Sequence, residues 1–314
     1  MHPDGPFCVG SVSGYGLCKD PGATHEGKGH AHAAAAPRSN VVWTENDGAM
    51  KSDFLRKILE KKREEVEAAR KRLPESQLRQ QAEADRATRQ FFHRLFAPGP
   101  DGVNIIAEIK RGSPSRGLIR EDLDAAEYAA RYEKGRAAAV SVLTDETFFW
   151  GGREDLVRAR QAVQLPVLRK DFILSSYQIY EAAAWGADAV LLIVRALDAE
   201  LLKDSLQLCR ELQLDALVEV HSERELEQAS TAGARLIGIN NRDLTTFITA
   251  IETSKRVVRH LDDGQVAVAE SGIHGRQQIE ELLDAGIWNF LIGESLVKAD
   301  NPELLLHQFL GRKP

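Results

Sequence analysis

Two oppositely charged residues lie in the segment Ile105–Gly117 (IIAEIKRGSPSRG), where an apolar run brackets Glu108 and Lys110 follows it. Glu108 and Lys110 stand two residues apart, which places both side chains on the same side of a β-strand. Burying two charges costs several kcal/mol unless other interactions offset the loss of water. A functional site would explain the pair, and a structural ion pair at a strand end is the alternative that this stretch alone leaves open.

Beyond residue 103, short apolar segments alternate with amphipathic segments of helical periodicity. Each apolar segment has the length and composition of a buried parallel strand. The expected strands are Asn104–Lys110, Ala138–Leu143, Val167–Lys170, Ala189–Val194, Ala216–Val220, Leu236–Asn240, Val266–Ala269 and Phe290–Ile292.

Eight strands alternating with eight helices over about 200 residues predict an α/β fold of the (β/α)8 TIM-barrel type. An open doubly wound sheet is the alternative, but no G-x-G-x-x-G motif follows the first strand. In a barrel the chemistry lies where the strands end. Those ends carry Glu108, Lys110, Ser141, Lys170, Glu219, Asn240, Glu270 and Ser271.

Lysines and glutamates that converge on one barrel mouth suggest a class of reaction. A lysine ammonium can donate a proton to a carbonyl or a leaving hydroxyl, and a glutamate of raised pKa can accept one. A lysine can also form a Schiff base with a carbonyl. Acid–base and Schiff-base chemistry on a carbonyl compound therefore both stay open, and no residue spacing typical of a metal site appears.

Two glycine-containing loops follow the last two expected strands. They are Ala269–Ile273 (AESGI) and Leu291–Ser295 (LIGES), and each leads into a helical segment. Barrels often bind phosphate at this position through backbone N–H groups. The two loops together predict a phosphorylated substrate.

The composition is that of an ordinary globular protein. The chain has 314 residues, of which 43% are hydrophobic, and a formal net charge of −6. This charge gives no footprint of nucleic-acid binding, and no apolar run approaches the roughly 20 residues of a membrane span. The three cysteines form no CxxC pair, which suits a reducing cytoplasm.

The N-terminal region differs from the rest. Residues 1–49 lack apolar periodicity and are expected to form a disordered extension, with Met50 as the natural start. Residues 50–314 are expected to form one barrel domain. Within 52–96 we expect two additional helices, separated at Leu73-Pro74 and with the second running from about Glu75 to Leu95. These helices are expected to pack on the barrel, from where Phe54 could reach a site.

Six motifs in order closely resemble the indole-3-glycerol-phosphate synthases of tryptophan biosynthesis. The resemblance runs from about Ser52 to the C-terminus. The motifs are Ile106–Ser115 (IAEIKRGSPS), Ser141–Glu146 (SVLTDE), Leu168–Ile173 (LRKDFI), Ile237–Leu244 (IGINNRDL), Val268–Ile273 (VAESGI) and Leu291–Leu296 (LIGESL).

The resemblance implies a carboxy-lyase. The family converts 1-(2-carboxyphenylamino)-1-deoxyribulose 5-phosphate into indole-3-glycerol phosphate, carbon dioxide and water, without metal or organic cofactor. The implied partner is this small phosphorylated substrate, with no nucleic acid and no membrane. We expect a cytoplasmic enzyme that is a monomer or a weak homodimer.

The resemblance also implies roles for individual residues. Lys170 resembles the general acid that protonates the ribulose carbonyl, and Lys110 the second lysine, which binds the substrate carboxylate. Glu219 resembles the general base or second acid of the dehydration. Glu108 and Glu270 resemble carboxylates that hold hydroxyls and lysines, and Asn240 resembles the amide that orients the anthranilate end.

Further positions are implied to bind substrate. The implied phosphate cradle contains Ser113, Gly272, Gly293 and Glu294, the last through its backbone N–H. Arg242 and Ser271 resemble other substrate contacts. The implied wall around the aromatic ring consists of Phe149, Phe172, Leu191, Ile193 and Ile292.

Five further polar residues are expected to have structural or surface roles. Arg111 and Arg116 are expected to be solvated charges, Asp171 to hold a loop or helix start, and His221 and His274 to lie in loops or at the surface.

Two rival functions stay open: another phosphate-binding barrel, such as a phosphosugar isomerase, and a catalytically silent barrel that binds a partner.

Overall fold

The computed structural model describes residues 48–84, 86–243 and 248–312, with side chains from Phe54 onward. The disorder expected before Met50 falls almost wholly outside these residues. Within them, no helix is long and apolar enough to cross a membrane.

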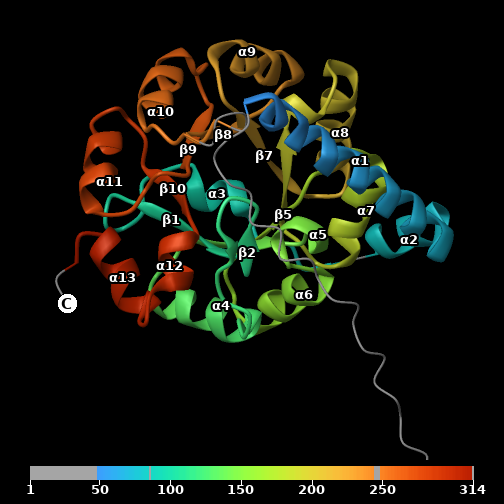
Figure 1. The fold of residues 1–314 in the computed structure, drawn as a ribbon, viewed down its shortest axis with the longest axis horizontal. Helices are drawn as coiled ribbons and strands as arrows, with labels where there is room; N and C mark the ends of the chain where they lie inside the picture. Colours follow the sequence, from blue (N-terminus) through green and yellow to red (C-terminus); the bar gives the residue numbers. More distant parts are fainter. Residues whose placement is uncertain (1–47, 85, 244–247, 313–314) are drawn as a thin grey trace, which may run out of the picture. The chain divides into compact units, whose positions relative to one another are not determined.

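The chain forms a closed barrel of eight parallel strands, which confirms the predicted (β/α)8 architecture (Figure 1). Neighbouring barrel strands in the chain are also neighbours in the sheet, and the first and last strands close the ring. The strands are β1 (Asn104–Ile109), β4 (Ala139–Leu143), β5 (Val167–Lys170), β6 (Ala189–Ile193), β7 (Asp215–Val220), β8 (Leu236–Asn240), β9 (Val266–Glu270) and β10 (Asn289–Ile292). A short antiparallel pair, β2 (Gly112–Ser113) and β3 (Gly117–Leu118), lies in the loop after β1.

Helices surround the barrel (Figure 1). Their apolar faces pack on the strands and bury residues such as Tyr132, Ile279 and Leu306, while a second cluster with Ile106 and Leu217 forms a separate part of the core. The helices after β1 are α4 (Ala125–Lys134), α5 (Glu146–Phe149), α6 (Arg153–Ala162), α7 (Ser176–Ala184), η1 (Val194–Ala196), α8 (Ala199–Glu211), α9 (Glu223–Ala232), α10 (Glu252–Val257), η2 (Val258–His260), α11 (Arg276–Leu283), α12 (Glu294–Lys298) and α13 (Pro302–Phe309).

Strand register brings the polar strand ends together. Glu108 on β1 is level with Ser141 on β4, and Asn240 on β8 is level with Glu270 on β9. Leu143 on β4 is level with Lys170, the last residue of β5. Because parallel strands all point the same way, their carboxyl ends form one rim.

In the described part of the chain, three helices precede the barrel: α1 (Gly48–Arg72), α2 (Glu75–Ala82) and α3 (Phe91–Leu95). The expectation of one helix from about 75 to 95 is wrong. Between α2 and α3, the backbone N–H of Arg89 donates to Asp188 Oδ1 at 2.8 Å. In the first turn of α3, the backbone N–H of Phe92 donates to Asp215 Oδ2 at 2.8 Å. These tertiary bonds compete with helical hydrogen bonds and outweigh the local propensity.

Arg86 fastens the same segment to the barrel. Its guanidinium donates to Ala187 O and Leu212 O, both at 2.7 Å. We expect Arg86→Met to lower the free energy of unfolding by about 1–3 kcal/mol, because two buried carbonyl groups lose their donor. Urea denaturation measures the change. Arg79→Met, which removes an exposed pair with Glu83, is the control and should change stability by less than about 1 kcal/mol; equal losses in both variants would contradict the role of Arg86.

Candidate active site

The ammonium of Lys170 lies between two buried carboxylates at the carboxyl end of the barrel. Lys170 Nζ is 3.1 Å from Glu270 Oε2 and 3.4 Å from Glu219 Oε2. The three side chains come from β5, β9 and β7, and only the lysine retains appreciable exposure, at 13%. One ammonium group is therefore shared by two carboxylates, so the protonation states of Lys170, Glu219 and Glu270 depend on one another.

Burial and neighbouring charges give Lys170, Glu219 and Glu270 pKa values that differ from one another and from their usual values. Burial alone would lower the pKa of Lys170, but Glu270, Glu219 and Glu108 outweigh it and raise the pKa above its usual value. Burial raises the pKa of Glu270 to about 7, with Lys170 opposing and Glu219 adding to the rise. For Glu219 the burial effect is outweighed by Lys170 and His221, so its pKa lies below the usual range. The site thus holds a persistent ammonium, an ionised glutamate and a glutamate that titrates near neutral pH.

A second lysine–glutamate pair lies beside the first. Lys110 Nζ is 2.7 Å from Glu108 Oε1, on the strand end predicted to carry a site. Two glycines make room for the buried carboxylates: a Cβ at Gly293 would lie 2.3 Å from Glu108 Oε1, and one at Gly238 would lie 2.2 Å from Glu270 Oε1. Any larger residue at either position would displace a carboxylate.

The loop after β9 has a strained backbone. Ser271 and Gly272 both have positive φ angles, 65° and 77°, and such strain in a non-glycine residue often marks a functional site. Asn241, a buried residue that sequence reasoning missed, donates from Nδ2 to Ser271 O at 3.1 Å. Its Oδ1 accepts bonds from the backbone and hydroxyl of Ser254. Asn241 therefore ties the strained loop to α10.

These groups open into a cavity with an empty volume of about 1220 Å³, the open mouth included. Every residue singled out from the sequence as catalytic or substrate-binding lines it. They are Glu108, Lys110, Ser113, Phe149, Lys170, Phe172, Leu191, Ile193, Glu219, Asn240, Arg242, Glu270, Ser271, Gly272, Ile292, Gly293 and Glu294. Helix α1 adds Phe54, as expected, and also Leu55 and Ile58, which the sequence did not single out.

Arg111 and Arg116 were both expected to be solvated charges, but the Arg111 side chain is bound to other protein groups. Its guanidinium pairs with both oxygens of Asp155 and donates to Leu123 O at 2.7 Å. Arg116 is more than half exposed, although its Nε lies 3.2 Å from Glu294 Oε1. Arg111 therefore secures the loop after β1 to α6.

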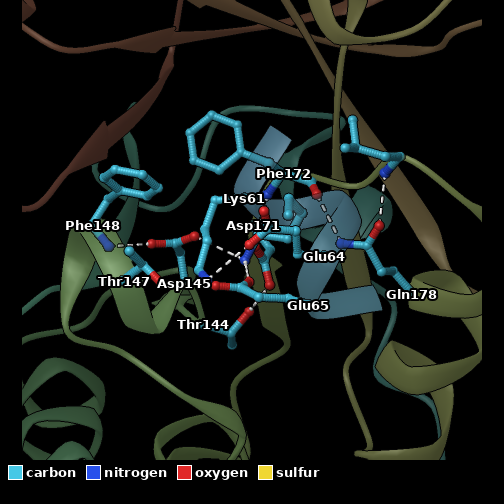
Figure 2. A network of polar contacts seen from close by, with 12 residues as sticks. Lys61, Glu64, Glu65, Thr144, Asp145, Thr147, Phe148, Asp171, Phe172 and Gln178 are labelled. Carbon is cyan, nitrogen blue, oxygen red and sulfur yellow. Dashed lines mark hydrogen bonds and ion pairs between the residues drawn. The ribbon is translucent and has the colours of Figure 1, made fainter. Parts of the chain in front are cut away.

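A buried ion cluster joins α1 to two strand ends, and sequence reasoning missed its lysine. Lys62 Nζ lies 2.7 Å from Glu65 Oε2, 2.8 Å from Asp145 Oδ2 and 3.0 Å from Asp171 Oδ1. Figure 2 shows the carboxylates Glu65, Asp145 and Asp171 facing one another. The lysine looks like an ordinary exposed residue of a charged amphipathic helix, so no local signal distinguishes it.

The two aspartates of this cluster hold the walls of the cavity. Asp145 accepts from the Phe148 N–H at 2.7 Å and so caps α5, which carries Phe149 (Figure 2). Asp171 follows Lys170 directly, and its Oδ2 accepts from Thr144 Oγ1 at 2.7 Å. This is the structural role expected for Asp171. Lys62 thus fixes both the aromatic wall and the strand end that carries Lys170.

Lys62→Met leaves two buried carboxylates without their shared cation. We expect a loss of about 3–5 kcal/mol in the free energy of unfolding, and a raised KM because α1 no longer holds its place over the mouth. Urea denaturation and steady-state kinetics measure both. The neighbouring Lys61, which pairs with Glu64 at the surface, supplies the control Lys61→Met; a Lys62 variant as stable as this control would refute the anchoring role.

The raised pKa of Glu270 predicts a dependence of stability on pH. Its carboxyl titrates near 4.5 in the unfolded chain and at about 7 when folded, so the folded state binds the extra proton between these values. That stabilisation is complete below about pH 4.5 and is lost as the pH rises through 7. Relative to Glu270→Gln, which does not titrate, the wild type should lose roughly 1–3 kcal/mol over this range.

Urea denaturation at pH 5 and pH 8 measures the difference between the two proteins. The exposed Glu227 provides the control, because Glu227→Gln should follow the wild type at both pH values. A constant difference between wild type and Glu270→Gln would show that Glu270 does not titrate in this range.

Among the described residues, no three or more histidines, cysteines, aspartates and glutamates are grouped so as to hold a metal ion. The polar groups of the mouth are instead ammonium–carboxylate pairs, an amide and hydroxyls. Such groups bind an anionic substrate and move protons.

Fold and site together define a (β/α)8-barrel enzyme with lysine–glutamate pairs at the carboxyl ends of its strands. The family model for indole-3-glycerol phosphate synthase matches residues 55–309. The chain belongs to this family.

Curated relatives agree with the family assignment. An indole-3-glycerol phosphate synthase of Syntrophobacter fumaroxidans is 59% identical over 260 residues, which cover 83% of this chain and 98% of that protein. The corresponding protein of Desulfosudis oleivorans is 55% identical over 263 residues, covering 82% and 99%. That of Carboxydothermus hydrogenoformans is 48% identical, covering 82% and 100%.

Solved structures of low identity share the fold. A thiamine phosphate pyrophosphorylase from Pyrococcus furiosus gives a TM-score of 0.52 at 15% identity, over 69% of this chain and 95% of that one. An N-acetylmannosamine-6-phosphate 2-epimerase from Clostridium perfringens gives 0.53 at 12% identity, over 73% and 99%. At such identities the likeness supports the fold alone.

Proposed function

We propose that this chain closes the indole ring of 1-(2-carboxyphenylamino)-1-deoxyribulose 5-phosphate and releases indole-3-glycerol phosphate, carbon dioxide and water. Membership of the synthase family supports the reaction. The observation that carries the mechanism is the Lys170 ammonium, held between Glu219 and Glu270 in the cavity.

Lys170 acts as the general acid that protonates the ribulose carbonyl. Its carboxylate neighbours raise its pKa, so the amine keeps its proton until the substrate takes it. Schiff-base formation needs a neutral amine, and the same carboxylates disfavour the neutral form of Lys170. Acid catalysis is therefore the better supported of the two chemistries left open by the sequence.

The remaining polar groups bind and orient the substrate. Lys110, paired with Glu108, binds the substrate carboxylate beside the ring carbon that forms the new bond. Asn240 orients the anthranilate end, and Arg242 reaches the rim, where its Nη1 donates to Ser115 Oγ at 3.0 Å. Two ammonium groups beside a carboxylate and a carbonyl stabilise the charge that moves during ring closure.

The phosphate and the aromatic ring occupy different parts of the cavity. Ser113, the Ser271–Gly272 turn and the Gly293–Glu294 backbone cradle the phosphate. The apolar wall takes the ring and lowers the local dielectric, which strengthens the polar contacts. It consists of Phe149, Phe172, Leu191, Ile193 and Ile292. A flexible substrate held at both ends is folded so that its reacting carbons meet.

Three features of the molecule stay predictions. They are residence in the cytoplasm, assembly as a monomer or weak homodimer, and 50–314 as one domain. Sedimentation velocity tests the second, and limited proteolysis followed by sequencing of the resistant fragment tests the third.

The test of the function is the rise of indole fluorescence when the purified chain meets the substrate in the presence of EDTA. We expect turnover by the wild type and a kcat lower by about 10²–10⁴ in Lys170→Ala, because the general acid is lost. Lys203→Ala, which changes an exposed lysine of α8, should match the wild type.

Each contrary outcome has a distinct meaning. No turnover by the folded wild type would refute the proposed reaction in favour of a sister phosphosugar reaction or a silent barrel. Turnover with an undiminished kcat in Lys170→Ala would keep the reaction and refute the role of Lys170.

A further inference from the structure

The side chain of Asn241 is buried behind the cavity wall, between two residues that line the cavity. Asn240 and Arg242 are lining residues, whereas Asn241 has only 2% of its surface exposed. Successive side chains of an extended segment point to opposite sides, which explains why Asn241 faces away from its neighbours. From this position it can hold the wall of the cavity without touching a substrate.

Asn241 holds the end of β9 and the turn that follows it. Its backbone N–H donates to Glu270 O at 2.9 Å, and its side-chain Nδ2 donates to Ser271 O at 3.1 Å. Its Oδ1 accepts from the Ser254 backbone N–H at 3.0 Å and from Ser254 Oγ at 2.8 Å. Because a backbone N–H can only donate, Ser254 identifies the oxygen end of the amide and leaves the NH2 group for Ser271.

The hydrogen bond to Ser271 O sets the direction of one peptide group. A trans peptide carries its C=O and its N–H on opposite sides, so the Gly272 N–H points away from Asn241. No backbone carbonyl of the described residues accepts from this N–H, and Gly272 lines the cavity. Backbone N–H groups of such turns are suited to binding an anion.

The same peptide could turn over easily if nothing held it. The flip changes ψ of Ser271 and φ of Gly272, and glycine accepts positive and negative φ alike. Glycine is nevertheless required here, since a Cβ on Gly272 would lie 2.6 Å from Thr249 Cγ2. A flipped peptide would direct the Ser271 carbonyl oxygen toward the cavity, where it would repel a phosphate.

We propose, on the basis of the function proposed above, that Asn241 is a positioning residue for the substrate phosphate. Its amide keeps the Ser271–Gly272 peptide in the orientation that presents an N–H to the phosphate. Glu270 O is held by the Asn241 backbone and not by its side chain. The Asn241 amide therefore acts on phosphate binding, and the contact of Glu270 with Lys170 does not depend on it.

Two variants remove the Asn241 donor in different ways. Aspartate and leucine have nearly the shape of asparagine, and neither carries an NH2 group. Asn241→Asp keeps an acceptor for Ser254 and attracts the Gly272 N–H, so it favours the flipped peptide. Asn241→Leu releases the peptide without adding charge. Ser254→Ala is the matched control, because it removes one bond to Oδ1 and keeps the bond from Nδ2 to Ser271.

Titration with inorganic phosphate, followed by amide NMR signals, tests the proposal without turnover. The dissociation constant should rise about 10–100-fold in Asn241→Leu, as expected for one lost hydrogen bond to a charged group, and at least as much in Asn241→Asp. Ser254→Ala should bind phosphate as the wild type does. Wild-type affinity in Asn241→Leu would overturn the proposal. A loss confined to Asn241→Asp would also overturn it, because added charge alone would explain that result.

The amide signal of Gly272 tests the direction of the peptide in the wild type, and so does not depend on the folding of any variant. Phosphate should shift this signal downfield, because the N–H gains a charge-assisted hydrogen bond. The amide of Gly233, which ends α9 and is not a lining residue of the cavity, is the control and should stay in place. A Gly272 signal that does not respond to phosphate would contradict the proposal.

Steady-state kinetics separate positioning of the phosphate from general damage to the site. In Asn241→Leu, KM should rise about 10–100-fold and kcat should stay within about threefold of wild type, because the lost interaction is made equally in the ground state and the transition state. A fall of kcat without a rise of KM would indicate displacement of Glu270 and refute the positioning role. Phosphate binding that depends on Asn241, in a protein without turnover, would support the positioning role and refute the proposed reaction.

Discussion

The structure depends on keeping one ammonium between two carboxylates inside a barrel mouth. Lys170, Glu219 and Glu270 come from three different strands, and their charges are offset only while all three strand ends keep their register. Burial of an uncompensated charge costs several kcal/mol, so loss of Lys170 would leave two buried carboxylates without their shared cation. Gly238 and Gly293 belong to the same constraint, because they leave the space that the Glu270 and Glu108 carboxylates occupy.

The N-terminal helix belongs to the site as much as to the scaffold. Through Lys62 it reaches Asp145, which caps α5, and Asp171, which directly follows Lys170. Its apolar side chains Phe54, Leu55 and Ile58 line the cavity on the same side. One helix therefore supplies both part of the cavity wall and the cation that anchors the segments after β4 and β5. A change in its packing would alter both the cavity wall and the segment that follows Lys170.

Two chemically identical side chains, those of Glu219 and Glu270, have pKa values shifted in opposite directions because their surroundings differ. Glu270 has burial as the dominant influence, and its pKa rises to about 7. Glu219 has Lys170 on one oxygen and His221 on the other, and its pKa falls. Proton transfer needs groups that differ in this way, since a single pKa cannot serve both for holding and for releasing a proton.

The barrel, its eight strands and the polar residues at their ends could be predicted from the sequence, because alternation of apolar and amphipathic segments is a local signal. Glu108 and Lys110 could be singled out from the sequence because charged residues in an apolar strand conflict with the local pattern. The break between α2 and α3 and the contacts of Lys62 and Asn241 appear only in the folded molecule. Each depends on a partner far away in the chain or on burial, such as Asp171 for Lys62 and Ser271 for Asn241. A surface-like residue acquires such a role only when folding removes its water and brings an opposite charge or a hydrogen-bond partner within reach.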